Sequence, residues 1–320
     1  MHLPLLALEV FCPRWSESAS DVASTKGDTS FFGAHQAPLC AVLQQERVLC
    51  RSRALALLGV QLGMRASSVR MLAPSAQIYP RDVAREQQLL QACALALLQY
   101  TPQVARIGAA GLVLDIGASL RLFGGIRSLC RLVRASMQQL GVTVRLACAP
   151  NPSAAYLLAC HRPLARVLQA QHLPRRLDRV PCHLLPEAQE FIPWLEGLAC
   201  TQLGQLRALP RPGLQRRCGS ALLQALDSVY GARQAALQFV QAPPSFQARL
   251  ELFARIEHSE ALLFAATALL QQLIGWLQVQ QLAVRGIALV FEHERGRAAL
   301  APTRLEILLA EPCTQQPHLL

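Results

Sequence analysis

The order of apolar and polar segments predicts a protein in which helices lie between strands. The first observation is a set of short apolar runs, at residues 3–11 and 105–116, and an alternating run at residues 142–149. The second is the helical spacing of the stretches between them, which is typical of α/β-type sheet domains. The third is size, because 320 residues that are 52% hydrophobic can form substantial cores in two to four domains.

The N-terminal half is predicted element by element. Residues 3–11 read as a strand, the polar residues to about 38 as a loop or insertion, and residues 39–50 as two strands joined by the turn QQER. Ser52 and Asp82 are suitable N-caps for two helices, and Pro74 closes another short helix. Residues 105–125 read as an apolar strand with Asp115 as its one acid, then a glycine pair that opens a basic helix at about 126–140. A strand at 142–149 and a helix from Pro152 follow.

The C-terminal half changes in composition. Short helices with Gly and Pro breaks are predicted for residues 184–231, and QAPPSFQ at 241–247 reads as a linker. A strand at 248–256, a long helix at 259–277 and strands at 283–291 and 303–309 come next. Glutamines within the apolar run 261–279 favour a core helix over a bilayer span, so no membrane partner is expected. This β-α-β-β series stops where another helix is expected, which indicates a chain that ends inside a domain.

The charge balance favours polyanionic partners. Lys and Arg number 31 against 20 Asp and Glu, which gives a formal net charge of +11. Between Asp115 and Asp178 there is no carboxylate, so the arginines of that segment must be solvated or paired with groups outside it. These arginines are Arg121, Arg127, Arg131, Arg134, Arg145, Arg162, Arg166, Arg175 and Arg176.

The eleven cysteines are scattered singly, with no spacing that suits zinc. Such a pattern is typical of buried or incidental thiols in a reducing cytosol. We therefore expect a cytoplasmic protein without a metal centre or a cofactor.

Several motifs resemble the Y-family (DinB/UmuC-type) translesion DNA polymerases, and most closely their ImuB-like, catalytically inactive branch. The stretches that carry the resemblance are LLGVQLGMRASSVRMLAPSAQIYPRD, GLVLDIGASLRLFGG, GVTVRLACAPNPSAAYLLACHRP and TQLGQLRALP, in the family's order. The resemblance implies an α+β, right-hand polymerase-like fold. Its parts would be a ferredoxin-like palm, small fingers, a helical thumb with a helix-hairpin-helix-like segment, and a βαββ(αβ) little finger that is truncated.

The resemblance also implies the domain boundaries. The palm would comprise residues 1–12 and 75–168, and the fingers-like segment, with its polar insertion, residues 13–74. The thumb would comprise residues 169–232, the linker residues 233–245, and the incomplete little finger residues 246–320.

Nucleotidyl transfer requires two divalent cations held by carboxylates. In this family those carboxylates would fall on Ala7, Ala110 and Gly111, none of which has an oxygen ligand in its side chain. Asp115 matches a later family Asp that does not bind metal, and we expect it to bond backbone at the end of the strand. The resemblance therefore implies that no catalytic residue is present. An alternative metal site formed by Glu9 and Asp115 would have too few ligands for two metal ions.

The triphosphate-binding set of the family is also broken. Where the family has Tyr and Arg, this chain has Arg53 and Ala56, and where it has a Lys pair, this chain has Pro152 and Tyr156. Two separate requirements of catalysis are thus missing together.

The DNA-holding parts are the remaining candidates. A helix-hairpin-helix-like thumb would present backbone N–H groups and arginines to phosphates. The candidate DNA-binding residues are Thr201, Gly204, Arg207, Arg211, Arg216 and Arg217 in the thumb, and Arg249, Arg285, Arg295 and Arg297 in the little finger. The sequence QAALQF has the form of a sliding-clamp peptide, with Gln234, Leu237 and Phe239 as its key residues.

By this resemblance the chain is a non-catalytic DNA-repair adaptor in translesion synthesis. It would bind primer-template DNA, an error-prone replicative-type DNA polymerase, a RecA-like accessory protein and the sliding clamp during SOS-type, damage-induced mutagenesis. Two alternatives stay open: an active error-prone translesion polymerase, and a protein-interaction module or truncated remnant without DNA affinity.

Overall fold

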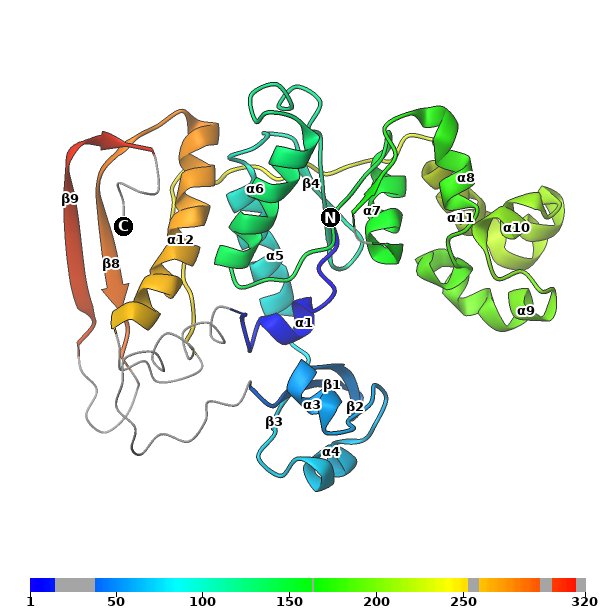
Figure 1. Cartoon of the computed structure of the whole chain (residues 1–320), viewed down its shortest axis with the longest axis horizontal. Helices are drawn as coiled ribbons and strands as arrows, with labels where there is room; N and C mark the ends of the chain where they lie inside the picture. Colours follow the sequence, from blue (N-terminus) through cyan, green and yellow to red (C-terminus); the bar gives the residue numbers. More distant parts are fainter. Residues whose placement is uncertain (15–37, 163, 253–258, 294–300, 315–320) are drawn as a thin grey trace.

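The computed structural model describes residues 1–14, 38–162, 164–252, 259–293 and 301–314. Figure 1 shows a central body of sheet and helices, a small β-rich unit below it, a helical unit to one side and a helix with two strands to the other. The described helices are α1 (Leu6–Glu9), α3 (Arg53–Leu57), α4 (Ala66–Leu72), α5 (Val83–Leu97), α6 (Ile126–Gln139), α7 (Pro152–His161), α8 (Leu173–Leu177), α9 (Ile192–Gly197), α10 (Leu203–Ala208), α11 (Arg211–Tyr230) and α12 (Ser259–Gln280).

Short 3₁₀ turns occupy Ala170–His172, Cys182–Leu184 and Pro186–Phe191. The described strands are β1 (Cys40–Gln44), β2 (Arg47–Arg51), β3 (Gln77–Pro80), β4 (Val104–Ile107), β5 (Gly111–Leu114), β6 (Ala147–Cys148), β7 (Ala165–Arg166), β8 (Val284–Phe291) and β9 (Thr303–Cys313).

The central sheet is assembled around the first three residues of the chain. β4 and β5 form an antiparallel hairpin, and the N-terminal residues lie beside β5, where the Leu3 N–H donates to the Ala110 carbonyl at 2.9 Å. On its other side, His2 exchanges backbone hydrogen bonds with Arg145 at 2.9 and 2.8 Å. β6 then pairs in parallel with β7. The N-terminal residues therefore join the β4–β5 hairpin to β6.

The two faces of this sheet are covered by different helices. Alternation along β5 sends Leu112 to one face and Gly111 to the other. Leu112 is fully buried in a cluster with residues of α5 and α6, including Leu97 and Leu129. Gly111 faces α7 instead, through the side chain of Tyr156. The sheet thus separates the α5–α6 core from the α7 side.

The strand predicted at residues 3–11 is wrong. Of this run only Leu3 bonds the sheet, next to Met1 and His2, and α1 begins at Leu6 with four buried residues. A short apolar run is compatible with a strand or with a buried helix, and periodicity alone does not separate them. Pro4 cannot donate a hydrogen bond to a sheet, which favours an end to the strand there.

Three other strand predictions also need correction. The single strand predicted within residues 105–125 is a hairpin, because Gly108 takes φ 58° and turns the chain between β4 and β5. In the predicted strand 142–149, strand structure is confined to β6 and a bridge at Arg145. Residues 248–252 form no strand, and the rest of the strand predicted at 248–256 lies outside the described residues.

The β-rich unit confirms its predicted elements. β1 pairs with β2 through a turn at Gln45 and Glu46, whose φ values are 49° and 61°, and with β3 in parallel. The Ser52 side chain caps α3 by accepting from the Leu55 N–H at 3.3 Å. Asp82 caps α5 in the same manner, by accepting from the Arg85 N–H at 3.0 Å.

The thiol prediction is wrong for one pair of cysteines. A disulfide joins Cys12, after α1, to Cys40 at the start of β1, while nine cysteines are free. Both residues belong to one apolar cluster between α1 and β1, which brings their side chains together although 28 positions separate them in sequence.

The helical unit confirms the predicted run of short helices after residue 184. Its core contains the fully buried Leu177, Leu195, Leu203, Leu206 and Leu222. Gly219 takes φ 76° within α11 and kinks that helix.

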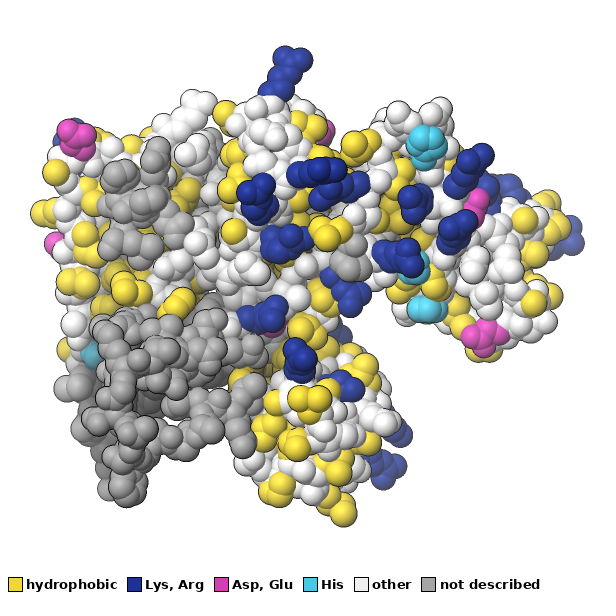
Figure 2. Space-filling view, in the orientation of Figure 1, with side chains coloured by type: hydrophobic (Ala, Val, Ile, Leu, Met, Phe, Trp, Pro, Cys, Tyr) yellow, Lys and Arg dark blue, Asp and Glu magenta, His cyan; other side chains and the backbone are white. Residues whose placement is uncertain are grey.

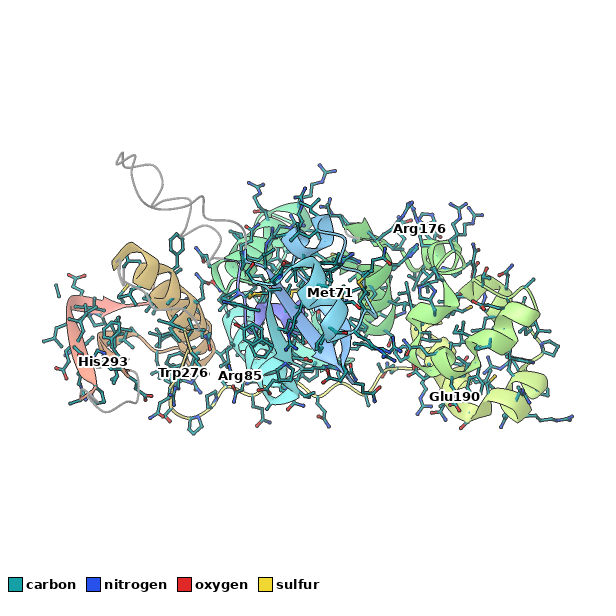
Figure 3. All side chains as sticks on the ribbon, turned by 90° about the horizontal axis from the view of Figure 1, so that it is seen from below. Met71, Arg85, Arg176, Glu190, Trp276 and His293 are labelled. Atoms are coloured by element: carbon teal, nitrogen blue, oxygen red, sulfur yellow. A yellow bond between two sulfur atoms is a disulfide. The ribbon has the colours of Figure 1, made fainter. Side chains whose placement is uncertain are left out.

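The segment after α11 runs along the central body before it reaches α12. The Val240 N–H donates to the Val104 carbonyl at 2.7 Å, so this segment extends the sheet at the edge of β4. Glu251 pairs with Arg85 of α5 at 3.0 Å, and Trp276 of α12 donates to the Pro243 carbonyl at 2.7 Å. Figure 3 shows Arg85 and Trp276 at this junction.

Helix α12 packs on α5 as the expected core helix. By length and composition, Leu262–Gln280 could also cross a membrane, yet 56% of that window is buried inside the protein. Ala268 lies in the core of the central body, and Gln271 bonds Gln139 of α6 and Gln99 after α5. Gly275 permits the closest approach, because a Cβ atom there would overlap the Leu95 carbonyl.

We predict that Gly275→Ala destabilises the protein by about 1–3 kcal/mol, since the added methyl group forces α12 away from α5. The matched control is Gly213→Ala in α11, where a Cβ atom meets nothing within 4 Å. That control should be neutral or stabilising by less than about 1 kcal/mol, from helix propensity. Urea unfolding checks both, and equal midpoints for the two variants would contradict the packing described here.

Candidate functional site

The positions that would hold metal in a polymerase meet at the β4–β5 turn. Ala110 lies in that turn, and Gly111 is the first residue of β5. Ala7 does not join them, because it lies in α1 and packs in the cluster with Cys40 and Val42. The residues that pair with Ala110 and Gly111 across the sheet are His2 and Leu3, so the alignment of Ala7 with a sheet position is wrong.

An aromatic ring occupies the space beside this turn. A Cβ atom at Gly108 would lie 2.7 Å from the Tyr156 oxygen, and one at Gly111 would overlap the Tyr156 ring. The Gly111 position is also closed by the Ile107 carbonyl oxygen, 2.6 Å from that Cβ. The His2 ring meets the Tyr156 ring edge-on, with centroids 5.9 Å apart. Tyr156 therefore fills the place that a carboxylate at position 111 would need.

Burial keeps this site uncharged. It raises the pKa of the Tyr156 hydroxyl far above its usual range, and the nearby Cys160 raises that pKa further. Burial also lowers the pKa of the His2 imidazole from 6.5, although a hydrogen bond with the Ala110 backbone opposes this change. His2 Nδ1 is buried without a hydrogen-bond partner among the described residues. Both side chains are neutral at neutral pH.

The two acids of the alternative catalytic set have other roles. Glu9 is 3% exposed, and its carboxylate accepts from the backbone N–H of Thr143 at 2.9 Å and from the Thr143 hydroxyl. Asp115 accepts from the Gly117 N–H at 3.0 Å, as expected for an acid that bonds backbone at the end of a strand. Both carboxylates therefore have structural roles, as acceptors of hydrogen bonds from the backbone.

The residues at this site do not fit a pair of magnesium ions. Magnesium requires oxygen ligands, mostly carboxylates and waters. Position 111 is a glycine against a tyrosine ring, and no group of three or more His, Cys, Asp or Glu suited to a metal occurs in the part of the chain that the structure describes.

The residues at the family's triphosphate-binding positions lie on two separate helices, α3 and α7. Arg53 is exposed on α3, and Ala56 follows it by one helical turn. Pro152 opens α7, whose N-cap Asn151 accepts from the Ala154 N–H at 2.7 Å. Tyr156, at the second lysine position, is the residue that fills the site.

In the helical unit, the structure separates the predicted DNA-binding residues into two groups. Arg207 contacts Asp178 at 3.4 Å and stacks on Tyr230, and Arg211 pairs with Asp227 through two bonds of 2.9 and 2.8 Å. This contact lowers the pKa of the Asp227 carboxyl. Arg216 and Arg217 form no ion pair with any described residue, although Arg217 lies over the Trp194 ring.

Thr201 and Gly204 serve the local packing of α10. The Gln205 side chain accepts from the Thr201 N–H at 2.9 Å, and this hydrogen bond helps to cap the N-terminus of α10. A Cβ atom at Gly204 would lie 2.7 Å from the Asp178 Cβ, so the glycine lets α10 approach the end of α8.

The remaining candidates lie beside α12. Arg249 pairs with Glu292 at 2.6 Å, and Arg285 is exposed on β8. Arg295 and Arg297 lie outside the described residues. Of the clamp-like residues, Gln234 is exposed and Leu237 is half-buried, while Phe239 is 52% exposed and bridges to Ala105 through its backbone.

Sequence reasoning missed the role of Tyr156. The pattern G-x-x-G at Gly108 and Gly111 was a usable signal, because two glycines on either side of a turn indicate a close approach by another group. What approaches them depends on the placement of α7 against the sheet, which no local pattern gives.

Comparisons with known proteins agree with the fold. The impB/mucB/samB family model matches residues 35–159. The chain is 27% identical over 241 residues to Protein ImuB of Caulobacter vibrioides strain NA1000 / CB15N, and equally to that of strain ATCC 19089 / CIP 103742 / CB 15. Each alignment covers 75% of this chain and 53% of the relative, so the chain spans about half the length of these relatives.

Solved structures of low identity share the fold. A ternary complex of Dbh matches with TM-score 0.53 and 14% identity, over 98% of this chain and 87% of that one. The crystal structure of DinB from Sulfolobus solfataricus matches with TM-score 0.50 and 17% identity, over 72% of this chain and 67% of that one. The chain therefore has the predicted α+β, right-hand polymerase-like architecture.

We predict that His2→Gln flattens the pH dependence of stability. Because the folded-state pKa of His2 lies below 6.5, the unfolded chain binds more protons as the pH falls through that value. The stability that neutral His2 contributes is complete above about pH 6.5 and is lost as the pH falls toward the folded pKa. The unfolding free energy of the wild type should fall more steeply than that of the variant between about pH 7 and about pH 5. Urea titrations at each pH measure this, and parallel curves would contradict it.

Proposed function

Because this chain resembles the Y-family, ImuB-like proteins in sequence and fold, we propose that it is a non-catalytic adaptor in DNA-damage-induced mutagenesis. The adaptor binds primer-template DNA and brings partner proteins to it. The observation that carries the proposal is the packing of Tyr156 on Gly108 and Gly111.

This packing opposes catalysis in a way that a missing ligand alone does not. A polymerase needs carboxylates that hold two cations beside the primer end. Here a side chain at position 111 would overlap an aromatic ring, so a single substitution does not restore a ligand. The half-buried Tyr156 ring, in edge-on contact with His2, occupies that space.

DNA binding is supported by charge and by fold. The net charge of +11 favours phosphate partners, and the matched structures include complexes named for Dbh DNA polymerase. We assign the main thumb contacts to Arg216 and Arg217, whose charges no described carboxylate neutralises. Arg207 and Arg211 are already engaged by Asp178 and Asp227.

The protein partners follow from the same proposal. They are an error-prone replicative-type DNA polymerase, a RecA-like accessory protein and the sliding clamp, in the cytoplasm and under an SOS-type response. For the clamp, the half-exposed side chain of Phe239 is available while its backbone bridges to β4. Gln234 is exposed five residues before it.

We predict no primer extension by the purified chain with magnesium and all four nucleotides, and the same result for Glu9→Gln and Asp115→Asn. The physical reason is that both acids bond backbone and position 111 is closed. An active Y-family polymerase in the same buffer is the positive control, and circular dichroism checks the folding of each variant. Extension that either substitution abolishes would establish the polymerase alternative instead.

We predict that Arg216→Gln/Arg217→Gln weakens binding to primer-template duplex and reduces its salt dependence. Each phosphate contact that the substitutions remove should lower the magnitude of the slope of log K against log salt by roughly 0.9. The matched variant Arg207→Gln/Arg211→Gln removes the same charge from residues that are already paired, and should change the slope less. Fluorescence anisotropy over a salt series measures both. Absence of binding at low salt would favour an interaction module without DNA affinity.

A further inference from the structure

A basic surface lies on the side of the central sheet that faces away from Tyr156. It consists of Arg127, Arg131 and Arg134 of α6 and Arg166 of β7, which we call the α6 arginine face. We propose that the α6 arginine face binds the phosphodiester backbone of a nucleic-acid strand. This goes beyond the proposed function, because the surface is separate from the thumb and its contacts do not require the thumb to bind.

The helix arranges three of these arginines in one row. Positions 127, 131 and 134 are spaced i, i+4 and i+7, which places them on one side of an α-helix. The opposite side is buried in the core through Leu129, Val133 and Met137. Arg127 and Arg131 are exposed and Arg134 is half-buried. The row therefore points outward over about 10 Å of helix.

Arg166 extends the row from the neighbouring strand. It pairs in β7 with Cys148 of β6, and the Cys148 thiol bonds Cys130 of α6. That hydrogen bond is the main reason why the pKa of the Cys130 thiol is lowered to about 6, and the charges of Arg166 and Arg134 lower it further. Both guanidinium groups thus lie near the same thiol, at the junction of α6 with the sheet edge.

The charge of this surface is not neutralised within the described protein. No carboxylate occurs in residues 116–177, and none of the four arginines forms an ion pair with a described residue. Figure 2 shows dark blue side chains gathered over α6 and continuing toward α7 and α8, with few magenta ones among them. A concentration of unpaired arginine of this kind attracts polyanions.

The sheet separates this surface from the Tyr156 site. Leu112 points to the α5–α6 core, whereas the adjacent Gly111 points to Tyr156 on α7. The α6 arginine face therefore lies behind one layer of sheet and one layer of helix.

Phosphate fits this surface better than an acidic protein does. Protein interfaces have an apolar centre, whereas interfaces with nucleic acid are more polar and strongly positive. Along α6, which the structure describes throughout, the one exposed large apolar side chain is Leu132, at 39%. Guanidinium groups also suit phosphate oxygens because they can bind them through two hydrogen bonds.

The test compares two double variants of equal charge in the full chain. Arg131→Gln/Arg134→Gln alters the proposed surface, and Arg65→Gln/Arg70→Gln removes two exposed arginines at and within α4. Fluorescence anisotropy with a labelled oligothymidylate, and separately with a duplex, is measured over a salt series. For the single strand, the α6 variant should lower the magnitude of the slope of log K against log salt by roughly 0.7 for each phosphate contact that it removes. Addition of Arg166→Gln should lower it again, and the α4 variant should match the wild type.

The outcomes separate this inference from the proposed function. If the α6 variant keeps the wild-type slopes on both probes, the inference about the α6 arginine face is overturned, whether or not the thumb variant weakens duplex binding. Unchanged slopes are also the result expected if this surface binds an acidic protein instead. A loss on the duplex alone would assign the site to double-stranded DNA. A loss in the α6 variant together with wild-type binding by Arg216→Gln/Arg217→Gln would support the inference and contradict the thumb contacts. Circular dichroism and equal urea midpoints confirm that each variant is folded.

Discussion

The contact between Tyr156 and the β4–β5 turn is the constraint on which the functional interpretation depends. It requires glycine at positions 108 and 111, because a Cβ atom at either would meet the tyrosine ring. It also fixes α7 against the sheet, and α7 leads into the helical unit. The same packing thus helps to place the helical unit relative to the central sheet.

The fold does not depend on carboxylates at the positions where a polymerase holds metal. The largest core lies on the other face of the sheet, where Leu97, Leu112 and Leu129 are fully buried between the strands and the α5 and α6 helices. Burial of this kind contributes on the order of 2 kcal/mol for each large side chain. Because metal ligands contribute nothing to that core, carboxylates can be replaced while the right-hand architecture persists.

Sequence reasoning was most successful where the signal is local. The caps Ser52 and Asp82, the glycine pair before α6 and the bond from Asp115 to backbone were all predictable from adjacent residues. It failed at residues 3–11, where an apolar run suited both a strand and a buried helix, and this failure misplaced Ala7. The closure of the site by Tyr156 was out of reach, because it joins residues 45 positions apart through tertiary packing.

The distribution of acids decides which arginines keep an uncancelled charge. Asp178 and Asp227 hold Arg207 and Arg211, Glu86 holds Arg81, and Glu9 is buried on Thr143. The ion pairs of Arg207, Arg211 and Arg81 each cancel an arginine charge that would otherwise attract phosphate, and the two with exposed partners add little stability. Arginines without such partners are therefore the candidates for contacts with a polyanion. Among them are Arg216 and Arg217 of the kinked helix α11 and the four arginines of the α6 arginine face, which the two proposals assign to nucleic acid.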